Sequence, residues 1–550
     1  MCIYGGIGWG SRQSRTEPSA GRGQAIAVKR SGARFGAGSS GRCLEVRRWW
    51  IGDDRIAALH MVRGNTLHCA TRADSWPSKS NPHHRDHDSA TMRIMQTLEK
   101  RAWESVRARI VTATSAMLLL SITSTTRAQD RVVVVVGANI PVTRGWESRP
   151  LIEPHLIAHP RVPGHVLGTM MVTTAAPDGT VEQPCATVLS VDGGLAWQQT
   201  TIDLVECGDP WLSMTPDGQA VLTVLGRTSS MADSSPHLLA FSSLDGGRTW
   251  NASPQDLGSG HDHMTGISDS SGNTFILSAQ GMRDSTGRVR FPIYAARRTS
   301  ATGAFDVLQR FVPSNLNQNT QGLAVLSDGT LVAFFVDFQR PRPPGGSPRD
   351  GLLERPRTWA LSLAPATTAF GVPQLISESC ASGSYLAADL TAGPYRDRLY
   401  HVCNDPSASR IEVGHSSDRG ERWSNPQPLE VNAGKAKSRI QPQVTVNKNG
   451  VIGVSWLDGR DDPAGRCYAL YFTASLNGGN TFLPPTRVST KPSCPDPKRN
   501  GASFDRWPQG GDYHGLAATS EGIFHAFWPD ASSGIFQTMA ARLEVRPQSK

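Results

Sequence analysis

Carboxyl and tyrosine side chains stand at the starts of several short strand-like runs in this sequence. They are Glu153, Asp262, Tyr385, Asp512 and Tyr513. When carboxyl groups are held close together, one can act as a proton donor and another as a base or nucleophile. A tyrosine can itself act as a nucleophile. We therefore predict Glu153, Asp262, Tyr385 and Tyr513 as catalytic candidates, and Asp512 as a substrate-binding residue beside them.

Arginines and a further aspartate follow the longer apolar runs, where a strand is expected to end. Arg283, Arg340, Asp458 and Arg460 hold these positions. A guanidinium group donates a fork of hydrogen bonds that matches a carboxylate, so these residues are predicted to bind substrate. The alternative for any one of them is a structural role, in which it caps a turn or bridges two neighbouring elements.

The elements that position these residues are marked by a repeated octet. It reads Ser-Leu-Asp-Gly-Gly-Arg-Thr-Trp at 243–250 and recurs at 190–197, 416–423 and 475–482. Its acidic or amide side chain can accept backbone N–H groups across a tight turn, and glycine supplies the positive φ angles that the turn needs. The key residues of the four copies are Asp192 with Trp197, Asp245 with Trp250, Asp418 with Trp423, and Asn477 with Phe482.

The octet resembles the Asp-box, or BNR repeat, of the sialidase superfamily, and the likeness covers most of the chain after about residue 150. The resemblance implies an all-β fold, a β-propeller of four-stranded blades. It also implies a catalytic set of three arginines, a tyrosine nucleophile assisted by a glutamate, and an aspartate acid/base. For the family's Arg-Ile-Pro element the near match is Arg161–Val162–Pro163, which reads more simply as a turn between strands.

The number of blades follows from the spacing of the repeats. The closing aromatic residues, including degenerate copies that end at Phe305 and Phe370, are 53 to 65 residues apart, and seven inner strands can be counted. The last repeat lacks a fourth strand, whereas the β-branched run at 131–136 has no partner. We predict that this run closes a seven-bladed ring and so removes two unpaired edges. Six blades are the alternative.

The chain divides into three parts. Residues 1–91 show no sustained periodicity and are expected to be a non-native or disordered extension, with the true start at Met92 or Met95. Residues 92–128 have the three parts of a signal peptide, with a short membrane anchor as the alternative, and 129–550 form the propeller. Residues 1–128 hold 20 Lys or Arg against 9 Asp or Glu, whereas the rest holds 36 against 38, so nucleic acid is not an expected partner.

Cysteine usage agrees with export to a secreted or periplasmic location. Six of the nine cysteines lie after residue 150, in pairs that are close in sequence. An even count in an exported chain favours disulfides. We predict the local pairing Cys185–Cys207, Cys380–Cys403 and Cys467–Cys494 among the connectivities that six cysteines allow.

No cofactor is predicted. The acidic loop 457–462 is a weak Ca²⁺ candidate without the ligand alternation of a known calcium loop, and the pair His261 and His263 lacks a third metal ligand. Two functions are favoured: an exo-glycosidase of sialidase type, and a non-catalytic module that binds a glycan or a protein at the same face. Other propeller chemistry, such as that of a lyase, is a third alternative. A glycan or glycoconjugate is the expected partner, and the sequence leaves the oligomeric state open.

Overall fold

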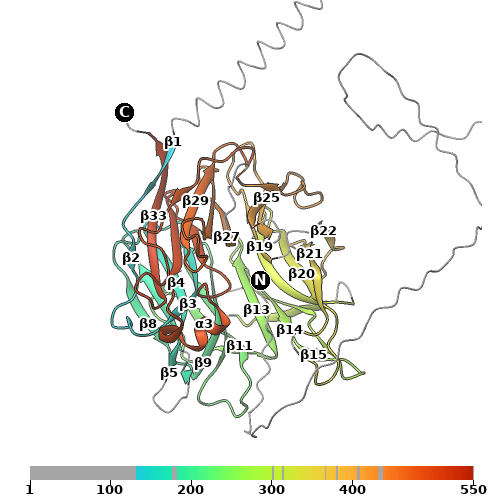
Figure 1. The fold of residues 1–550 in the computed structure, drawn as a ribbon. Coiled ribbons are helices and arrows are strands. Elements are labelled where there is room, and N and C mark those ends of the chain that lie inside the picture. The colour runs from blue at the N-terminus through green and yellow to red at the C-terminus, as the bar shows by residue number, and fades with distance from the viewer. Residues whose placement is uncertain are drawn as a thin grey trace, which may run out of the picture. The chain divides into compact units, whose positions relative to one another are not determined.

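The computed structural model describes residues 132–175, 181–182, 184–299, 303–311, 315–347, 349–365, 367–378, 382–405, 409–430 and 438–548. These residues form seven four-stranded antiparallel sheets, the blades of a β-propeller (Figure 1). Within the described ranges, the helices are two short ones, α2 (Pro497–Asn500) and α3 (Ala502–Arg506). The predicted extension and signal peptide, residues 1–128, lie outside the described residues.

Each blade runs from an inner to an outer strand. Blades 1 to 4 are β3 (Leu151–Ala158), β4 (Val166–Val172), β7 (Cys185–Ser190) and β8 (Gln198–Ile202); β9 (Glu206–Met214), β10 (Ala220–Arg227), β11 (His237–Ser243) and β12 (Gln255–Ser259); β13 (His261–Ser268), β14 (Thr274–Gln280), β17 (Ile293–Arg298) and β18 (Asp306–Phe311); β19 (Asn317–Val325), β20 (Leu331–Gln339), β21 (Leu352–Leu363) and β22 (Gln374–Ser377).

The remaining blades follow the same order. Blades 5 to 7 are β23 (Ser382–Ala388), β24 (Leu399–Asp405), β25 (Arg410–Ser416) and β26 (Gln427–Pro428); β27 (Arg439–Val446), β28 (Ile452–Asp458), β29 (Ala469–Ser475) and β30 (Thr486–Arg487); β31 (Gly515–Ala518), β32 (Phe524–Asp530), β33 (Gln537–Pro547) and β1 (Val132–Val136). The short strand β2 (Ile140–Pro141) also pairs with β33, as a fifth strand of blade 7. Among the residues described, two hairpins lie outside the blades: β5 (Thr174–Ala175) with β6 (Val181–Glu182), and β15 (Met282–Arg283) with β16 (Val289–Arg290).

The first described strand closes the ring, as predicted. β1 pairs antiparallel with β33, in a register that sets Val132 opposite Pro547 and Val136 opposite Leu543. Figure 1 shows the two strands side by side, one at the blue and one at the red end of the colour scale. Seven blades are therefore confirmed, and the six-bladed alternative is wrong.

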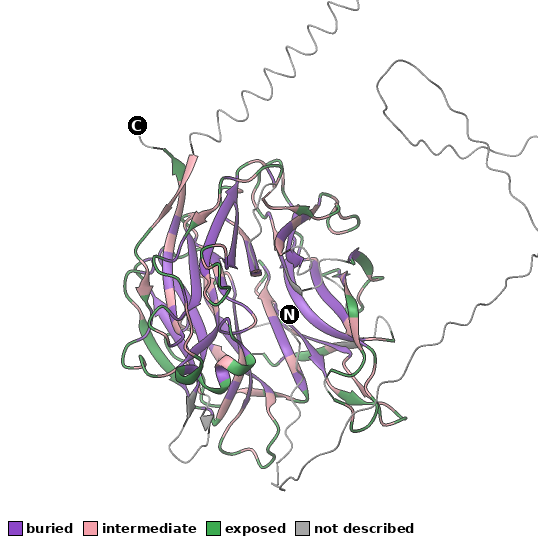
Figure 2. Cartoon of the chain, viewed as in Figure 1, coloured by how far each residue is buried: buried purple, intermediate pink, exposed green. Residues whose placement is uncertain are grey.

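The core lies between neighbouring blades. Second strands such as β4, β14 and β28 are buried along their whole length, because they are covered on both faces (Figure 2). Leu167 of blade 1 and Phe241 of blade 2, for example, belong to one apolar cluster. A run that is buried on both faces is apolar at nearly every position, which is why these strands stood out in the sequence.

The octets form the turns between third and fourth strands. In the copy at 243–250, Asp245 Oδ1 accepts hydrogen bonds from the N–H groups of Arg248 (3.0 Å) and Thr249 (2.9 Å), and Ser243 Oγ accepts one from Gly247 N–H (2.8 Å). The other three copies make the same Ser-to-Gly bond and an equivalent bond to the acidic or amide side chain.

Each Asp-box turn also packs on the preceding blade. Trp250 Nε1 donates to Thr187 Oγ1 (3.1 Å) of blade 1, and the glycines at Gly246 and Gly247 lie against His165 and Leu167 of that blade. A Cβ atom at either glycine would come within 2.6 Å of those side chains, so glycine is required by space as well as by φ. The boxes therefore join neighbouring blades.

Two of the three predicted disulfides are present, Cys185–Cys207 and Cys467–Cys494, with Cα–Cα distances of 5.5 and 4.4 Å. The third, Cys380–Cys403, includes Cys380, which lies outside the described residues. Such bonds are typical of chains that fold in an oxidising compartment. Across the described ranges, we find no helix with the length and apolar character needed to cross a membrane.

Candidate functional site

The inner strands of several blades share an irregularity near their starts. The pairing of the first two strands shifts register after Ile152 in blade 1, after Asp262 in blade 3 and after Ile440 in blade 6. At these bulges the backbone takes positive φ angles that side chains other than glycine rarely adopt: 52° at Glu153, 46° at Asp209, 48° at His263 and 52° at Gln441. Such strain persists where the surrounding structure enforces it, often at functional sites.

Four carboxyl groups from four consecutive blades interact at this level. They form what we call the acidic cluster: Glu153, Asp209, Asp262 and Asp512. Glu153 is fully buried, and within the described residues neither of its carboxyl oxygens has a hydrogen-bond donor. The three aspartates are part-exposed. The cluster is therefore buried at Glu153 and partly accessible to solvent at its three aspartates.

The shared environment keeps protons on the cluster. Desolvation raises the pKa of Glu153 well above its usual value, and the charges of Asp209 and Asp512 raise it further. Desolvation, with the charge of Asp209, raises the pKa of Asp262 to about 6, and the pKa of Asp512 is raised by desolvation as well. Like charges in one site cannot all ionise together, so protonated and ionised carboxyls coexist here near neutral pH.

Backbone and amide groups fix the cluster in place. Asp209 Oδ2 accepts a hydrogen bond from the backbone N–H of His263 (3.1 Å). The N–H of Glu153 donates to Gly510 O (3.0 Å), and a Cβ atom at Gly511 would lie 2.5 Å from Glu153 Cγ. Glycine at 511 is thus what lets this segment approach Glu153.

The predicted tyrosines lie beside the cluster. Tyr513 is buried, its hydroxyl donates to Pro210 O (3.4 Å), and its ring packs against Trp211 with centroids 5.3 Å apart. Burial raises the pKa of Tyr513 well above its usual value, and the charges of Glu153 and Asp209 and the nearby Tyr385 raise it further. A neutral phenol with a structural hydrogen bond is the state that these surroundings favour.

The opposite half of the ring presents amides instead of acids. Gln321, Gln441 and Gln443 are buried on the inner strands of blades 4 and 6. In the described part of the chain, Gln441 Oε1 and Gln443 Nε2 have no hydrogen-bond partner. Unsatisfied buried polar atoms are uncommon, and here they gather at the same level as the acidic cluster.

The connection between blades 6 and 7 adds residues that the sequence reasoning missed. It starts at the Cys467–Cys494 disulfide, passes through α2 and α3, and ends at Asp512. The positive charge of Arg506, at the end of α3, acts on Glu153, Asp262 and Asp512, and its guanidinium stacks on Trp507 at 4.0 Å. Trp507 Nε1 donates to Asp512 Oδ2 (3.3 Å). Helices this short carry no periodic signal, so nothing in the sequence marked Arg506.

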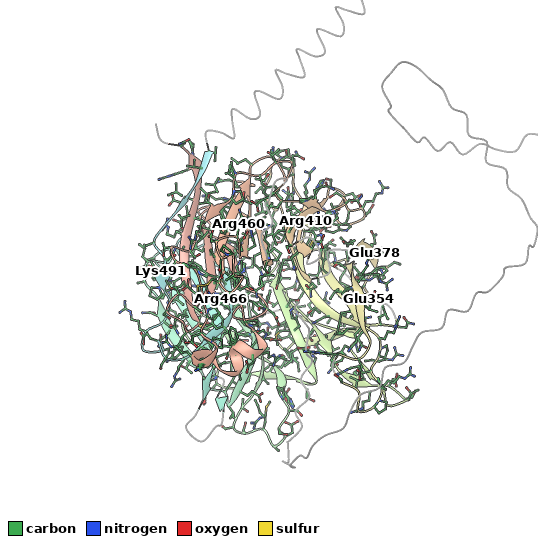
Figure 3. All side chains as sticks on the ribbon, in the orientation of Figure 1. Glu354, Glu378, Arg410, Arg460, Arg466 and Lys491 are labelled. Carbon is green, nitrogen blue, oxygen red and sulfur yellow. A yellow bond between two sulfur atoms is a disulfide. The ribbon has the colours of Figure 1, made fainter. Side chains whose placement is uncertain are left out.

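Asp458 and Arg460 do not join the acidic cluster. Asp458 is fully buried and accepts hydrogen bonds from Trp456 Nε1 (2.7 Å) and Arg439 Nε (3.1 Å). Arg460 forms a bidentate pair with Glu430 (3.0 and 2.6 Å) and lies over the Tyr471 ring at 4.3 Å. Figure 3 shows Arg460 over the strands of this blade. Both side chains have structural partners, in blade 6 and in the connection that leads into it from blade 5.

Arg283 and Arg340 lie in connections of blades 3 and 4. Arg283 is exposed on β15 and donates to Gly287 O (3.1 Å). Arg340 follows β20 and lines a separate cavity. The structure thus gathers Glu153, Asp262, Tyr385, Asp512 and Tyr513, and leaves the four other predicted residues outside this group.

The metal candidates have protein partners. Asp461 accepts a hydrogen bond from Tyr471 Oη (3.0 Å), and Asp462 accepts backbone N–H groups of its own turn. His261 is hydrogen-bonded to Ser278 Oγ (2.7 Å). Within the described ranges, no three His, Cys, Asp or Glu side chains are arranged to hold a metal ion.

No protein-family model matches this sequence, and no curated protein does either. Among solved structures, the chain is similar to a protein of unknown function from Dyadobacter fermentans (10% identity over 75% of this chain and 99% of that one, TM-score 0.42). It is also similar to the Trypanosoma rangeli sialidase in complex with the inhibitor DANA (11% identity over 74% of this chain and 59% of that one, TM-score 0.37). A third similar structure is the GH93 α-L-arabinofuranosidase of Fusarium graminearum with arabinobiose (11% identity over 74% of this chain and 97% of that one, TM-score 0.42). The chain's own seven blades and its four octet turns make it a β-propeller.

Proposed function

We propose that this protein is a secreted or periplasmic glycoside hydrolase that cleaves a bond to an uncharged sugar at the acidic cluster. The observation that carries the proposal is the cluster itself, one buried carboxyl and three part-exposed ones drawn from four blades. Glycoside hydrolysis needs a protonated carboxyl for the leaving oxygen and an ionised one at the anomeric carbon or its attacking water.

The surroundings of each carboxyl support a division of roles. Asp262, with a pKa of about 6, is the proton donor. Asp209 accepts the His263 N–H at 3.1 Å and acts as the carboxylate, either as nucleophile or as base. Burial raises the pKa of Glu153, so this carboxyl stays protonated and adds no negative charge beside Asp209. The charge of Arg506, which stacks on Trp507, acts on both Glu153 and Asp262.

The balance of charge supports an uncharged sugar. A sialidase-type enzyme holds its anionic sugar with several arginines, whereas Arg506 is the arginine that acts on the cluster within the described residues. Four carboxyls disfavour a second anion, and the amides of Gln441 and Gln443 suit hydroxyl groups. A test must distinguish this proposal from two alternatives, a sialidase activity and glycan binding without turnover.

The test is incubation of the purified protein with neutral and sialylated oligosaccharides, with the products identified by mass spectrometry. We expect release of a neutral sugar, with a kcat that falls as pH rises through about 6, because Asp262 loses its proton. Asp262→Asn lowers kcat by about 10²- to 10⁴-fold. The exposed Asp306→Asn on β18 is the matched control and keeps the wild-type rate.

Release of sialic acid alone would overturn the choice of substrate. Binding of glycans without any product, from protein shown to be folded, would assign the chain to the non-catalytic class.

A further inference from the structure

A second candidate site lies away from the acidic cluster, where connections of blades 3 and 4 meet. A cavity of about 420 Å³ is lined there by Arg288, Arg290 and Arg340. Its apolar walls are Leu316, Pro341 and Pro343. Pockets that bind small ligands have volumes of roughly 300–1,000 Å³ and combine apolar walls with a few polar groups.

Two long connections between strands line this cavity and are hydrogen-bonded to each other. The first is the β15–β16 hairpin between β14 and β17, and the second is the connection after β20, of which residues 340–347 and 349–351 are described. They are joined by reciprocal backbone hydrogen bonds between Val289 and Arg342, of 3.1 and 3.2 Å. Arg342 in turn lies over the Phe291 ring at 5.6 Å. The cavity is thus bordered by a tied pair of loops.

These loops concentrate positive charge. Residues 282–290 and 340–357 together hold eight arginines against three acidic residues, in a chain whose part from 129 onward has 36 Lys or Arg against 38 Asp or Glu. Arg290 is paired with Asp284 at 2.9 Å. For Arg288 and Arg340, no acidic side chain of the described residues lies within ion-pair distance.

We propose that this cavity is a binding subsite for the anionic group, a carboxylate or a sulfate ester, of an acidic glycan. Arg288 and Arg340 supply forked donors that match the oxygens of either group, and the proline and leucine walls suit the apolar face of a sugar ring. The subsite lies on the end of the ring where second-to-third strand connections meet the starts of inner strands. It therefore shares a face with the acidic cluster.

The subsite is displaced along the surface from that cluster. Leu316 precedes β19, and Gln321, on the level of the cluster, lies five residues later, about 17 Å along a strand. A glycan that reaches both sites would place its anionic unit at least one sugar away from the cleaved bond. Binding at the subsite is expected whether or not the cluster hydrolyses glycans.

Binding is measured by isothermal titration with four probes of matched length: an oligogalacturonate, a sulfated glucan oligosaccharide, a neutral malto-oligosaccharide and inorganic polyphosphate. We expect one of the two acidic oligosaccharides to bind, and the tighter of them identifies the anion. R288E/R340E is expected to weaken that binding at least tenfold. R161E, in the turn between β3 and β4 at the opposite end of the ring, changes it less than twofold.

R288Q/R340Q, which reverses no charge, gives the same loss in case the charge-reversed variant does not fold, and circular dichroism checks each variant. Three outcomes overturn the proposal: no acidic oligosaccharide binds, R161E weakens binding as much as R288E/R340E does, or polyphosphate binds as tightly as the glycans. The assay records binding without turnover, so a missing hydrolase activity leaves its result unaffected.

Discussion

Glu153 has a backbone conformation that costs free energy, and among the described residues no donor reaches its buried carboxyl oxygens. A positive φ at a residue with a Cβ and an unsatisfied buried carboxyl are each unfavourable on their own. Both are maintained by the contacts of Gly510 and Gly511 from the blade 6–7 connection. The residue is therefore a site where the fold gives up stability.

Replacing Glu153 by Gln tests that cost. The pKa of Glu153 is raised in the folded protein, so the native state holds a proton that the unfolded state releases above pH about 4.5. The wild-type free energy of unfolding therefore falls as pH rises above that value. Gln resembles the protonated form, and E153Q should match the wild type at pH 5 and exceed it at pH 8 by about 1–3 kcal/mol.

Urea denaturation at both pH values measures this difference. The exposed Glu354→Gln, labelled in Figure 3, is the control and should show no such pH dependence. An E153Q variant that is equally destabilised at pH 5 and pH 8 would mean that Glu153 is ionised in the folded protein.

At the scale of elements, the Asp box joins a local turn to a contact between blades. Its side-chain hydrogen bonds close the turn, and its glycines and tryptophan rest on the preceding blade. Partial burial works to raise the pKa of Asp245, but the hydrogen bonds from Thr249, Ser243 and Arg248 outweigh it and lower the pKa. This contribution to stability is present above the unfolded pKa and is lost as pH falls through the folded one.

The amide copy of the box supplies a matched pair of variants. Asn477 keeps the acceptor function, since its Oδ1 accepts the N–H of Thr481 at 3.0 Å. We expect Asp245→Ala to lower the free energy of unfolding at pH 7 by about 1–3 kcal/mol, and Asp245→Asn to lower it by less than half as much. Chemical denaturation followed by tryptophan fluorescence measures both. Equal losses in the two variants would show that the hydrogen-bond acceptor contributes little.

At the scale of the whole propeller, the ring is closed by strand pairing between β1 and β33. Val132, Val134 and Val136 pack against the apolar cluster between blades 6 and 7, which contains Phe524 and Leu543, whereas Val133 and Val135 alternate to the other side. Closure therefore depends on one face of a five-residue strand.

Valine-to-aspartate changes on the two faces separate closure from general strand propensity. Val134→Asp places a charge against the apolar cluster and should lower the free energy of unfolding by about 2–4 kcal/mol. Val135→Asp is the control, with a loss of about 1 kcal/mol or less. Thermal unfolding followed by circular dichroism compares them, and equal losses would contradict one-sided closure.

The sequence predicted what is local and periodic. The Asp boxes were predicted from Asp245, its glycines and their repeats. The second strands were predicted from continuous apolar runs, and the closing strand from a run of valines without a partner. The acidic cluster depends on backbone bulges, and a positive φ at Glu153 or Asp209 leaves no compositional mark. From the sequence, Arg460 was predicted to bind substrate. Its pairing with Glu430 was not predicted, because the two residues are 30 positions apart in the chain.

The pairing of β1 with β33 also has a consequence for how the chain is made. Synthesis produces the five consecutive valines of β1 about 400 residues before the strand that covers them. Throughout that interval a short, uncharged β-branched segment has a free edge, the kind of sequence that pairs with other chains. Until ribosomes finish the last blade, newborn copies of this protein are therefore at risk of joining one another through their first strand.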